Sequence, residues 1–222
     1  MTITFVKIKF SELKEILKRD PELVHRRNSA GETLLTEACR RGNIKAASFL
    51  IEAGADVNAR SLLGYTALIE AAMIGNTKIA SLLIAAGADV NARSRLGNTA
   101  LIEAAMKGNV KIVSLLVGAG ADVDAQDKYD STALIEAAVR GNAKIVSLLV
   151  GAGADVNVRS PLGYTALIEA AMIGNTKIAS LLVAAGADVG ARDNHNLTAL
   201  DYAKLRGAKR IISLLIKAGA KE

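Results

Sequence analysis

The chain has 222 residues, of which 51% are hydrophobic and 23% are charged, so it can bury a core and its composition argues against intrinsic disorder. A single cysteine excludes an intramolecular disulfide framework, and no apolar run is long enough to predict a membrane span. The net charge of +6 is concentrated in residues 1–60 and 193–222, whereas residues 61–192 are neutral, which argues against a continuous nucleic-acid groove.

The first 27 residues differ from the rest of the chain. Residues 1–10 contain two lysines and lack the long apolar core and small-residue cleavage site of a signal peptide, so we expect a cytoplasmic protein. Residues 11–17 have apolar side chains at helical spacing, which predicts one amphipathic helix that ends at Asp20 and Pro21. We therefore expect residues 1–27 to form an N-terminal cap.

From residue 28 onward the sequence repeats with a period of 33 residues. The full blocks share one register and cover residues 28–60, 61–93, 94–126, 127–159 and 160–192, and a shorter block covers residues 193–222. A repeat of this length predicts a solenoid in which each unit packs only on its neighbours. We expect one domain over residues 1–222, with the last block as a C-terminal cap.

Each block predicts two short helices. In residues 61–93, Thr66 can cap a first helix that ends at Gly75, and Asn76 can cap a second helix that is followed by Gly87 in a left-handed conformation. A polar connection with a turn glycine leads to the next block. Helices of this length are not stable alone in water, so their stability must come from stacking.

The turn glycine is Gly97 in the connection that follows this block. The corresponding residues are Asp130 in the fourth block and Asn196 in the last block, and both residue types tolerate a positive φ better than most.

These blocks resemble the ankyrin repeat. The resemblance rests on Gly-x-Thr-x-Leu at the start of the first helix, Gly-Asn between the helices and Gly-Ala-Asp-Val-Asn after the second helix. It implies an all-α ankyrin-repeat solenoid of stacked antiparallel helix pairs with protruding β-turn loops, and a role in protein–protein binding. One departure is Thr-Ala-Leu-Ile where the family usually has Thr-Pro-Leu-His, which leaves the fold expectation unchanged.

The blocks are unusually similar to one another. Residues 61–93 and 160–192 are identical at 30 of 33 positions and differ at Leu62/Pro161, Ile84/Val183 and Asn91/Gly190. This similarity, together with distinct ends, resembles a designed or consensus-engineered ankyrin protein with an N-cap, five full repeats and a C-cap. A natural array with recent duplications is the alternative.

No residue pattern predicts catalysis. His25 and His195 lie at opposite ends of the expected stack, and Cys39 occupies a position that is alanine in the other full blocks. No metal-ligand cluster is present, and no glycine-rich segment leads into the lysine of a phosphate loop. We therefore expect no enzyme activity, no cofactor and no metal site.

Two charged rows recur with the period. The first contains Glu37, Glu70, Glu103, Glu136 and Glu169, and helical spacing predicts the ion pairs Glu37–Arg41, Glu103–Lys107 and Glu136–Arg140. The second contains Lys45, Lys78, Lys111, Lys144 and Lys177, and we interpret it as a solvated outer face. Neither row by itself requires a ligand.

The resemblance implies a concave partner-binding surface formed by the turn tips and the exposed face of the first helices. Carried over by position, its residues are Arg41, Leu62, Tyr65, Met73, Ile74, Arg95, Asn98, Met106, Lys107, Tyr129, Arg140, Tyr164, Met172 and Ile173. Tyr, Met and Arg are enriched at protein interfaces. We expect a monomer that binds an unidentified protein, and neither nucleic acid nor a membrane.

The engineered binder is the favoured interpretation of this surface. Two other readings are a natural ankyrin adaptor or inhibitor, and a stable scaffold without a specific partner.

Overall fold

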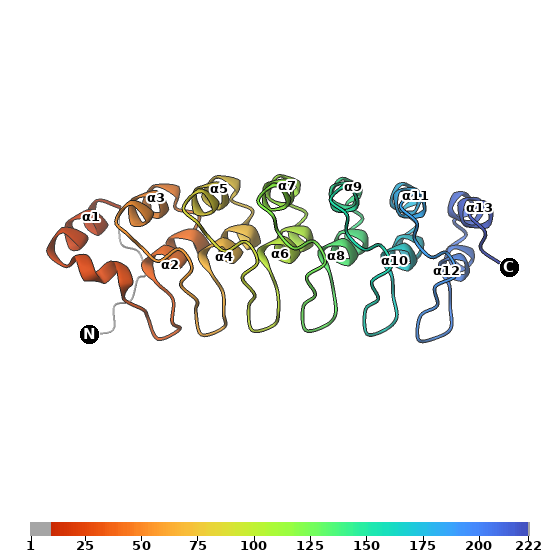
Figure 1. Ribbon diagram of the computed structural model, residues 1–222, viewed down its shortest axis with the longest axis horizontal. Helices are drawn as coiled ribbons and strands as arrows, with labels where there is room; N and C mark the ends of the chain where they lie inside the picture. Colours follow the sequence, from red (N-terminus) through yellow and green to blue (C-terminus); the bar gives the residue numbers. More distant parts are fainter. Residues whose placement is uncertain (1–9, 222) are drawn as a thin grey trace.

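A computed structural model describes residues 10–221 as two parallel rows of helices with a row of loops beside them (Figure 1). The inner row, next to the loops, contains α2 (Leu34–Arg40), α4 (Ala67–Ile74), α6 (Ala100–Lys107), α8 (Ala133–Val139), α10 (Ala166–Ile173) and α12 (Ala199–Arg206). The outer row contains α3 (Ile44–Glu52), α5 (Thr77–Ala85), α7 (Val110–Gly118), α9 (Ala143–Gly151), α11 (Thr176–Ala184) and α13 (Lys209–Lys217). The expectation of an all-α solenoid of stacked helix pairs is confirmed.

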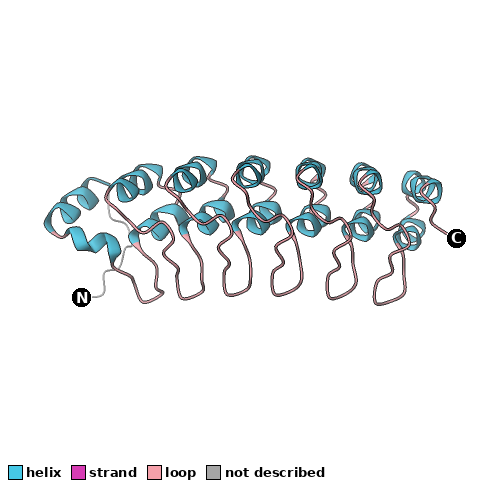
Figure 2. Ribbon diagram, in the orientation of Figure 1, coloured by secondary structure: helices cyan, strands magenta, loops and turns pink. Residues whose placement is uncertain are grey.

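The loops between each outer helix and the next inner helix all project to the same side of the stack (Figure 2). Each closes with backbone hydrogen bonds, such as Gly64 N–H to the Ser61 carbonyl at 2.8 Å, and we call these segments the hairpin loops. Within residues 10–221 the only strand-like pairings are two isolated bridges, Arg27–Thr33 and Arg192–Thr198. The hairpin loops therefore extend the stack sideways without forming a regular sheet.

Helix boundaries follow from the capping residues predicted from sequence. The Thr66 hydroxyl accepts a hydrogen bond from the Ile69 amide at 3.3 Å, and the Asn76 side chain accepts one from the Ile79 amide at 3.1 Å. Gly75 ends α4 with φ +76°, a left-handed conformation that costs glycine little. These caps satisfy amide groups that a short helix leaves without partners inside the helix.

The turn position also behaves as predicted. Asp130 and Asn196 are the non-glycine residues with positive φ among residues 10–221, with φ +52° and +63°. Close packing also favours glycine at this position, because a Cβ on Gly64 would lie 2.9 Å from the Arg95 amide nitrogen of the next hairpin loop.

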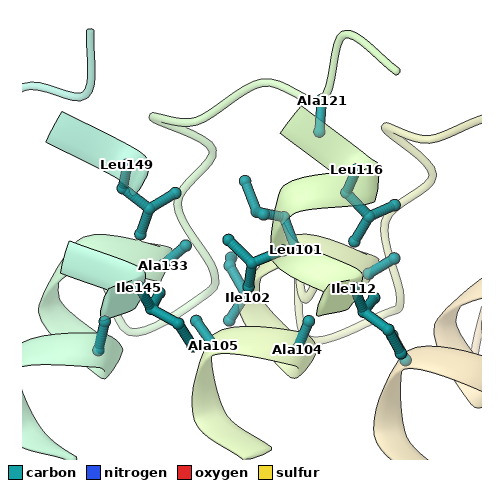
Figure 3. Packing of buried hydrophobic residues seen from close by; sticks show 14 of the residues in the cluster. Leu101, Ile102, Ala104, Ala105, Ile112, Leu116, Ala121, Ala133, Ile145 and Leu149 are labelled. Carbon is teal, nitrogen blue, oxygen red and sulfur yellow. The ribbon is translucent and has the colours of Figure 1, made fainter. Parts of the chain in front are cut away.

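One continuous core runs between the two rows of helices (Figure 3). In each unit the inner helix contributes small and branched side chains, such as Leu101 and Ala104, and the outer helix contributes Ile112 and Leu116. These residues are almost completely buried, and neighbouring inner helices pack directly on each other. Stability therefore depends on contacts between units, as expected for a stack.

The N-terminal end has the predicted amphipathic helix, α1 (Phe10–Arg19), which buries Leu13 and Leu17 against the first helix pair. A 3-10 helix, Pro21–His25, follows it and buries Leu23 and Val24. The suggested strap or leader at residues 1–9 lies outside the described residues. Among residues 10–221, no helix combines the length and apolar character needed to cross a membrane.

Candidate partner-binding surface

Neighbouring hairpin loops are joined by backbone hydrogen bonds near their tips. The Leu62 amide donates to the Ala30 carbonyl at 2.8 Å, and the Arg95 amide donates to the Leu63 carbonyl at 2.9 Å. The same bond recurs from Lys128 to Leu96 and from Asn194 to Leu162. These contacts link residues about one repeat apart and hold the tips side by side.

A row of arginines supports the loops at their base. The guanidinium groups of Arg27, Arg60, Arg93 and Arg159 each donate to the backbone carbonyl 33 residues further along the chain. The structure gives these arginines a structural role, because each guanidinium joins two consecutive hairpin loops.

One junction lacks both kinds of bond. Pro161 has no amide hydrogen to donate to the preceding loop, and Gln126 replaces the arginine that would reach the Arg159 carbonyl. Among residues 10–221 this loop junction, between residues 127–131 and 160–164, is the one that has neither bond. We call it the open junction.

We call the set of predicted binding residues the hairpin surface. It consists of the hairpin-loop tips and the C-terminal ends of the inner helices. Exposed members of the predicted set are Arg41, Leu62, Ile74, Arg95, Lys107, Tyr129 and Arg140, and half-buried members are Tyr65, Met73, Asn98, Met106, Tyr164, Met172 and Ile173. The set spans most of the stack, and two hairpin loops, residues 94–98 and 127–131, lie between the loops of Tyr65 and Tyr164.

The half-buried members also contribute to folding. Tyr65, Met73, Met106, Tyr164 and Met172 pack against the hydrophobic core. Tyr164 additionally forms an edge contact with Tyr202, at 6.2 Å between ring centroids. Substitution at these positions would therefore lower stability as well as affect a partner, whereas the exposed members can be changed at smaller cost.

The sequence-based set omitted several exposed apolar residues, among them Leu96, which is 43% exposed at a loop tip. Leu63 and Leu162 occupy the corresponding position in other loops and are also exposed. The 33-residue period could have identified Leu96 as a loop-tip residue, because the three leucines occupy the same position in their repeats.

A row of carboxylates lies beside the hairpin surface, and only one of the three predicted ion pairs forms. Glu37 pairs with Arg41, and also with Arg40. The predictions for Glu103–Lys107 and Glu136–Arg140 were wrong, since neither pair lies within 4.0 Å among residues 10–221.

Hydrogen bonds from the hairpin loops replace the two missing pairs. Glu103 accepts one from the side-chain amide of Asn98 at 2.7 Å, and Glu136 accepts one from the Ser131 hydroxyl at 2.9 Å. These donors lie five residues earlier in the chain and are held in place by the loop. The side chains of Lys107 and Arg140, which were the predicted partners, are exposed to solvent instead.

The corresponding residues in the two most similar units are Glu70 and Glu169, where tyrosine replaces the asparagine or serine donor. Burial raises the pKa of Glu70 to about 7; Arg40 opposes this increase, and nearby carboxylates add to it. Burial, followed by the charge of Glu136, also raises the pKa of Glu169.

An acid whose pKa is raised by folding keeps its proton in the native state after the unfolded chain has lost it. Glu70 therefore lowers stability as the pH rises from its ordinary pKa towards 7. Below that pH the Glu70 carboxyl is largely protonated in the folded chain.

Comparison with known proteins identifies the fold family. A family model for ankyrin repeats, built from three copies of the repeat, matches residues 8–94, 86–160 and 134–222. The chain belongs to the ankyrin-repeat family. Ankyrin repeats generally mediate protein–protein interactions, and their fold is typically non-enzymatic.

The ankyrin stack is similar to a solved structure. An ankyrin repeat domain from Acinetobacter baumannii AYE has a TM-score of 0.79 and 36% sequence identity, over 84% of this chain and 98% of that chain. No curated protein matches the chain significantly in sequence.

Reactive groups in this ankyrin stack are scattered or buried. Cys39 is completely buried, and burial raises the pKa of its thiol to about 12, with a smaller contribution from Glu70. His25 lies in the N-terminal 3-10 helix, and His195 lies in the last hairpin loop. Among residues 10–221, no three His, Cys, Asp or Glu side chains are grouped in a way that could hold a metal ion.

Proposed function

We propose that this ankyrin-repeat protein binds a protein partner through the hairpin surface. The observation that carries the proposal is the exposure of large apolar side chains on that surface. Tyr129 is 63% exposed, Leu62 is 57% exposed and Ile74 is 44% exposed, although the same chain buries its core leucines almost completely. Large apolar side chains gathered on one face of a soluble protein commonly mark an interaction site.

Two similar apolar groups lie towards the ends of this surface. One contains Leu63, Tyr65, Met73 and Ile74, and the other contains the corresponding Leu162, Tyr164, Met172 and Ile173. Between them the surface is more basic, with Arg95, Lys107 and Arg140 exposed. A partner with apolar contacts near both ends and acidic groups between them would complement this pattern.

The experiment compares two double variants, each of which replaces two exposed apolar side chains. Ile74→Ser with Tyr129→Ser changes the hairpin surface, and Ile16→Ser with Ile216→Ser changes exposed residues on α1 and α13. Each protein is used as bait in a cell lysate, and captured proteins are quantified by mass spectrometry.

We expect at least one protein that the unchanged chain and the α1/α13 variant both retain. Its recovery with the hairpin variant should fall about tenfold, the scale of a single interface hot spot. If all three baits retain the same proteins, the hairpin surface is not the binding site. If none retains a specific protein, the chain is a scaffold without a partner in that lysate.

We also propose the internal division and the origin of the array. Residues 1–27 and 193–222 would cap five 33-residue units in a monomer, and the array would be a consensus design. The identity of 30 of 33 positions between residues 61–93 and 160–192 supports this origin.

A further inference from the structure

The turns that connect inner to outer helices form a basic edge along the whole stack. We call the segments 40–45, 73–78, 106–111, 139–144, 172–177 and 204–210 the turn edge. They contain 13 of the 28 Lys and Arg residues and no Asp or Glu. All thirteen side chains are exposed: Arg40, Arg41, Lys45, Lys78, Lys107, Lys111, Arg140, Lys144, Lys177, Lys204, Arg206, Lys209 and Arg210.

Few of these charges are neutralised within the chain. Arg40 and Arg41 pair with carboxylates on or near α2, and no other turn-edge cation lies within 4.0 Å of a carboxylate among residues 10–221. Exposed aspartates follow the opposite ends of the outer helices, at positions such as Asp89 and Asp122. Charge is therefore segregated across the stack, although residues 61–192 are neutral in total.

The outer helices place six of the cations in a regular row. Lys45, Lys78, Lys111, Lys144, Lys177 and Arg210 are each the second residue of their helix. Neighbouring outer helices contact each other and stand side by side in Figure 1. Packed helices lie about 10 Å apart, so the row advances by about that distance at each step.

Shallow apolar grooves accompany this row. One groove of about 350 Å³ crosses α7, α9 and α11, where Val110, Leu148 and Leu181 line it and Lys144 and Lys177 lie beside them. Half-buried leucines recur at the same position of the outer helices: Leu82, Leu115, Leu148, Leu181 and Leu214. The outer row thus offers cations and partly exposed apolar side chains together.

We propose that the turn edge and outer helices bind an acidic amphipathic helix of a protein partner. Residues on one face of an α-helix recur every seven positions, or about 10.5 Å, which is close to the step of the cation row. Carboxylates at that spacing can meet one cation per unit, and apolar side chains beside them can enter the grooves. The cation row and the grooves lie on the outer helices, away from the loop tips, so the proposal does not depend on the function proposed above, although the turn edge shares Arg41, Lys107 and Arg140 with the hairpin surface.

Other anionic partners match these features less well. Single-stranded nucleic acid favours aromatic side chains for stacking, and the six turn segments contain none. A phosphate backbone or a flat anionic membrane would be attracted by the cations but would not use the recessed leucines.

The test uses a synthetic four-heptad helix with Glu and Leu on one face, and the same peptide with Gln in place of Glu. Binding to the full chain is measured by fluorescence anisotropy at low and at physiological salt. One variant carries Lys78→Gln, Lys111→Gln and Lys144→Gln. Its control loses the same charge elsewhere, through Arg19→Gln, Lys217→Gln and Lys221→Gln.

We expect the Glu peptide to bind the unchanged chain and the control equally, and the row variant about tenfold more weakly at low salt. The Gln peptide should not bind measurably. Leu62→Ser with Tyr129→Ser, which changes two exposed loop-tip residues outside the turn edge, should leave peptide affinity unchanged, which separates this site from the loop tips of the hairpin surface.

Three results would overturn the proposal. The Glu peptide could fail to bind, or both triple variants could weaken binding equally, which would indicate a diffuse effect of net charge. In the third result, duplex DNA or vesicles containing phosphatidylserine would bind the chain more tightly than the peptide does, and their binding would depend on the lysine row in the same way.

Discussion

The open junction between residues 127–131 and 160–164 contrasts with the junction just before it, between residues 94–98 and 127–131. At the earlier junction, the Lys128 amide donates to the Leu96 carbonyl and the Arg93 guanidinium donates to the Gln126 carbonyl. At the open junction, Pro161 and Gln126 remove both donors. The helices beneath are continuous, because α8 packs on α10 as α6 packs on α8.

This contrast shows that two separate sets of contacts hold the units together. One set joins the helices and is called the helix layer, and the other joins the hairpin loops and is called the loop layer. The helix layer depends on buried apolar side chains that scarcely vary between units. The loop layer depends on one backbone amide and one arginine per junction, and it can be interrupted without changing the fold. The interruption falls between Tyr129 and Leu162, so it divides the proposed partner surface into two parts.

The largest expected effect comes from opening the earlier junction. The variant Arg93→Gln with Lys128→Pro gives the earlier junction the same two residue types, Gln and Pro, that stand at the open junction. Pro161 shows that a hairpin loop accommodates proline at this position. We expect the free energy of unfolding to fall by about 2 kcal/mol, because a charge-assisted and a backbone hydrogen bond are lost. Urea unfolding measures the change.

Arg95→Gln with Lys128→Gln is the matched control, because it removes the same charge and keeps both donors. A loss of the same size in this control would show that the loop hydrogen bonds are not responsible.

A smaller effect is expected from closing the open junction. Gln126→Arg with Pro161→Leu restores both donors, and we expect the free energy of unfolding to rise by about 1 kcal/mol. The gain is smaller because the new arginine must be ordered and the unfolded chain regains the freedom that proline removed. Urea unfolding of this variant and of Gln126→Lys measures it. No gain over the lysine variant would contradict the role of the guanidinium.

The smallest effect is expected from Pro161→Leu alone. It restores one amide donor and removes one proline, so the two contributions nearly cancel and stability should change by less than about 0.5 kcal/mol. Hydrogen exchange gives a more direct measurement. The amide introduced at position 161 should be protected about as well as that of Leu62, and rapid exchange would mean that the two loops are not in register.

Local chemistry explains why much of the fold was predictable. Thr66, Asn76 and Gly75 act on the backbone within a few residues, so their capping roles follow from the sequence. The same reasoning failed for Glu103, where helical spacing predicted Lys107 as its partner. The Asn98 side chain takes that place, because the hairpin loop folds it back towards the helix. Spacing along one helix contains no information about a donor that a loop brings back.

The candidate surface was predictable in position and less so in detail. The period placed Tyr65, Tyr129 and Met73 on one row, but it did not distinguish the exposed Tyr129 from side chains that pack on the core. Burial depends on what the neighbouring unit supplies, and that unit lies 33 residues away in sequence. The partner role of these residues, and the division into caps and five units, remain predictions.

The sequence by itself determined the helix pairs, their caps and the stacked arrangement, because a 33-residue period leaves each unit's apolar face to its neighbours. Only the tertiary structure decided how arginines join successive loops, where that joining is interrupted and how thirteen cations align on one edge. These properties arise from contacts between units, and such contacts depend on the distance and direction at which one unit packs on the next.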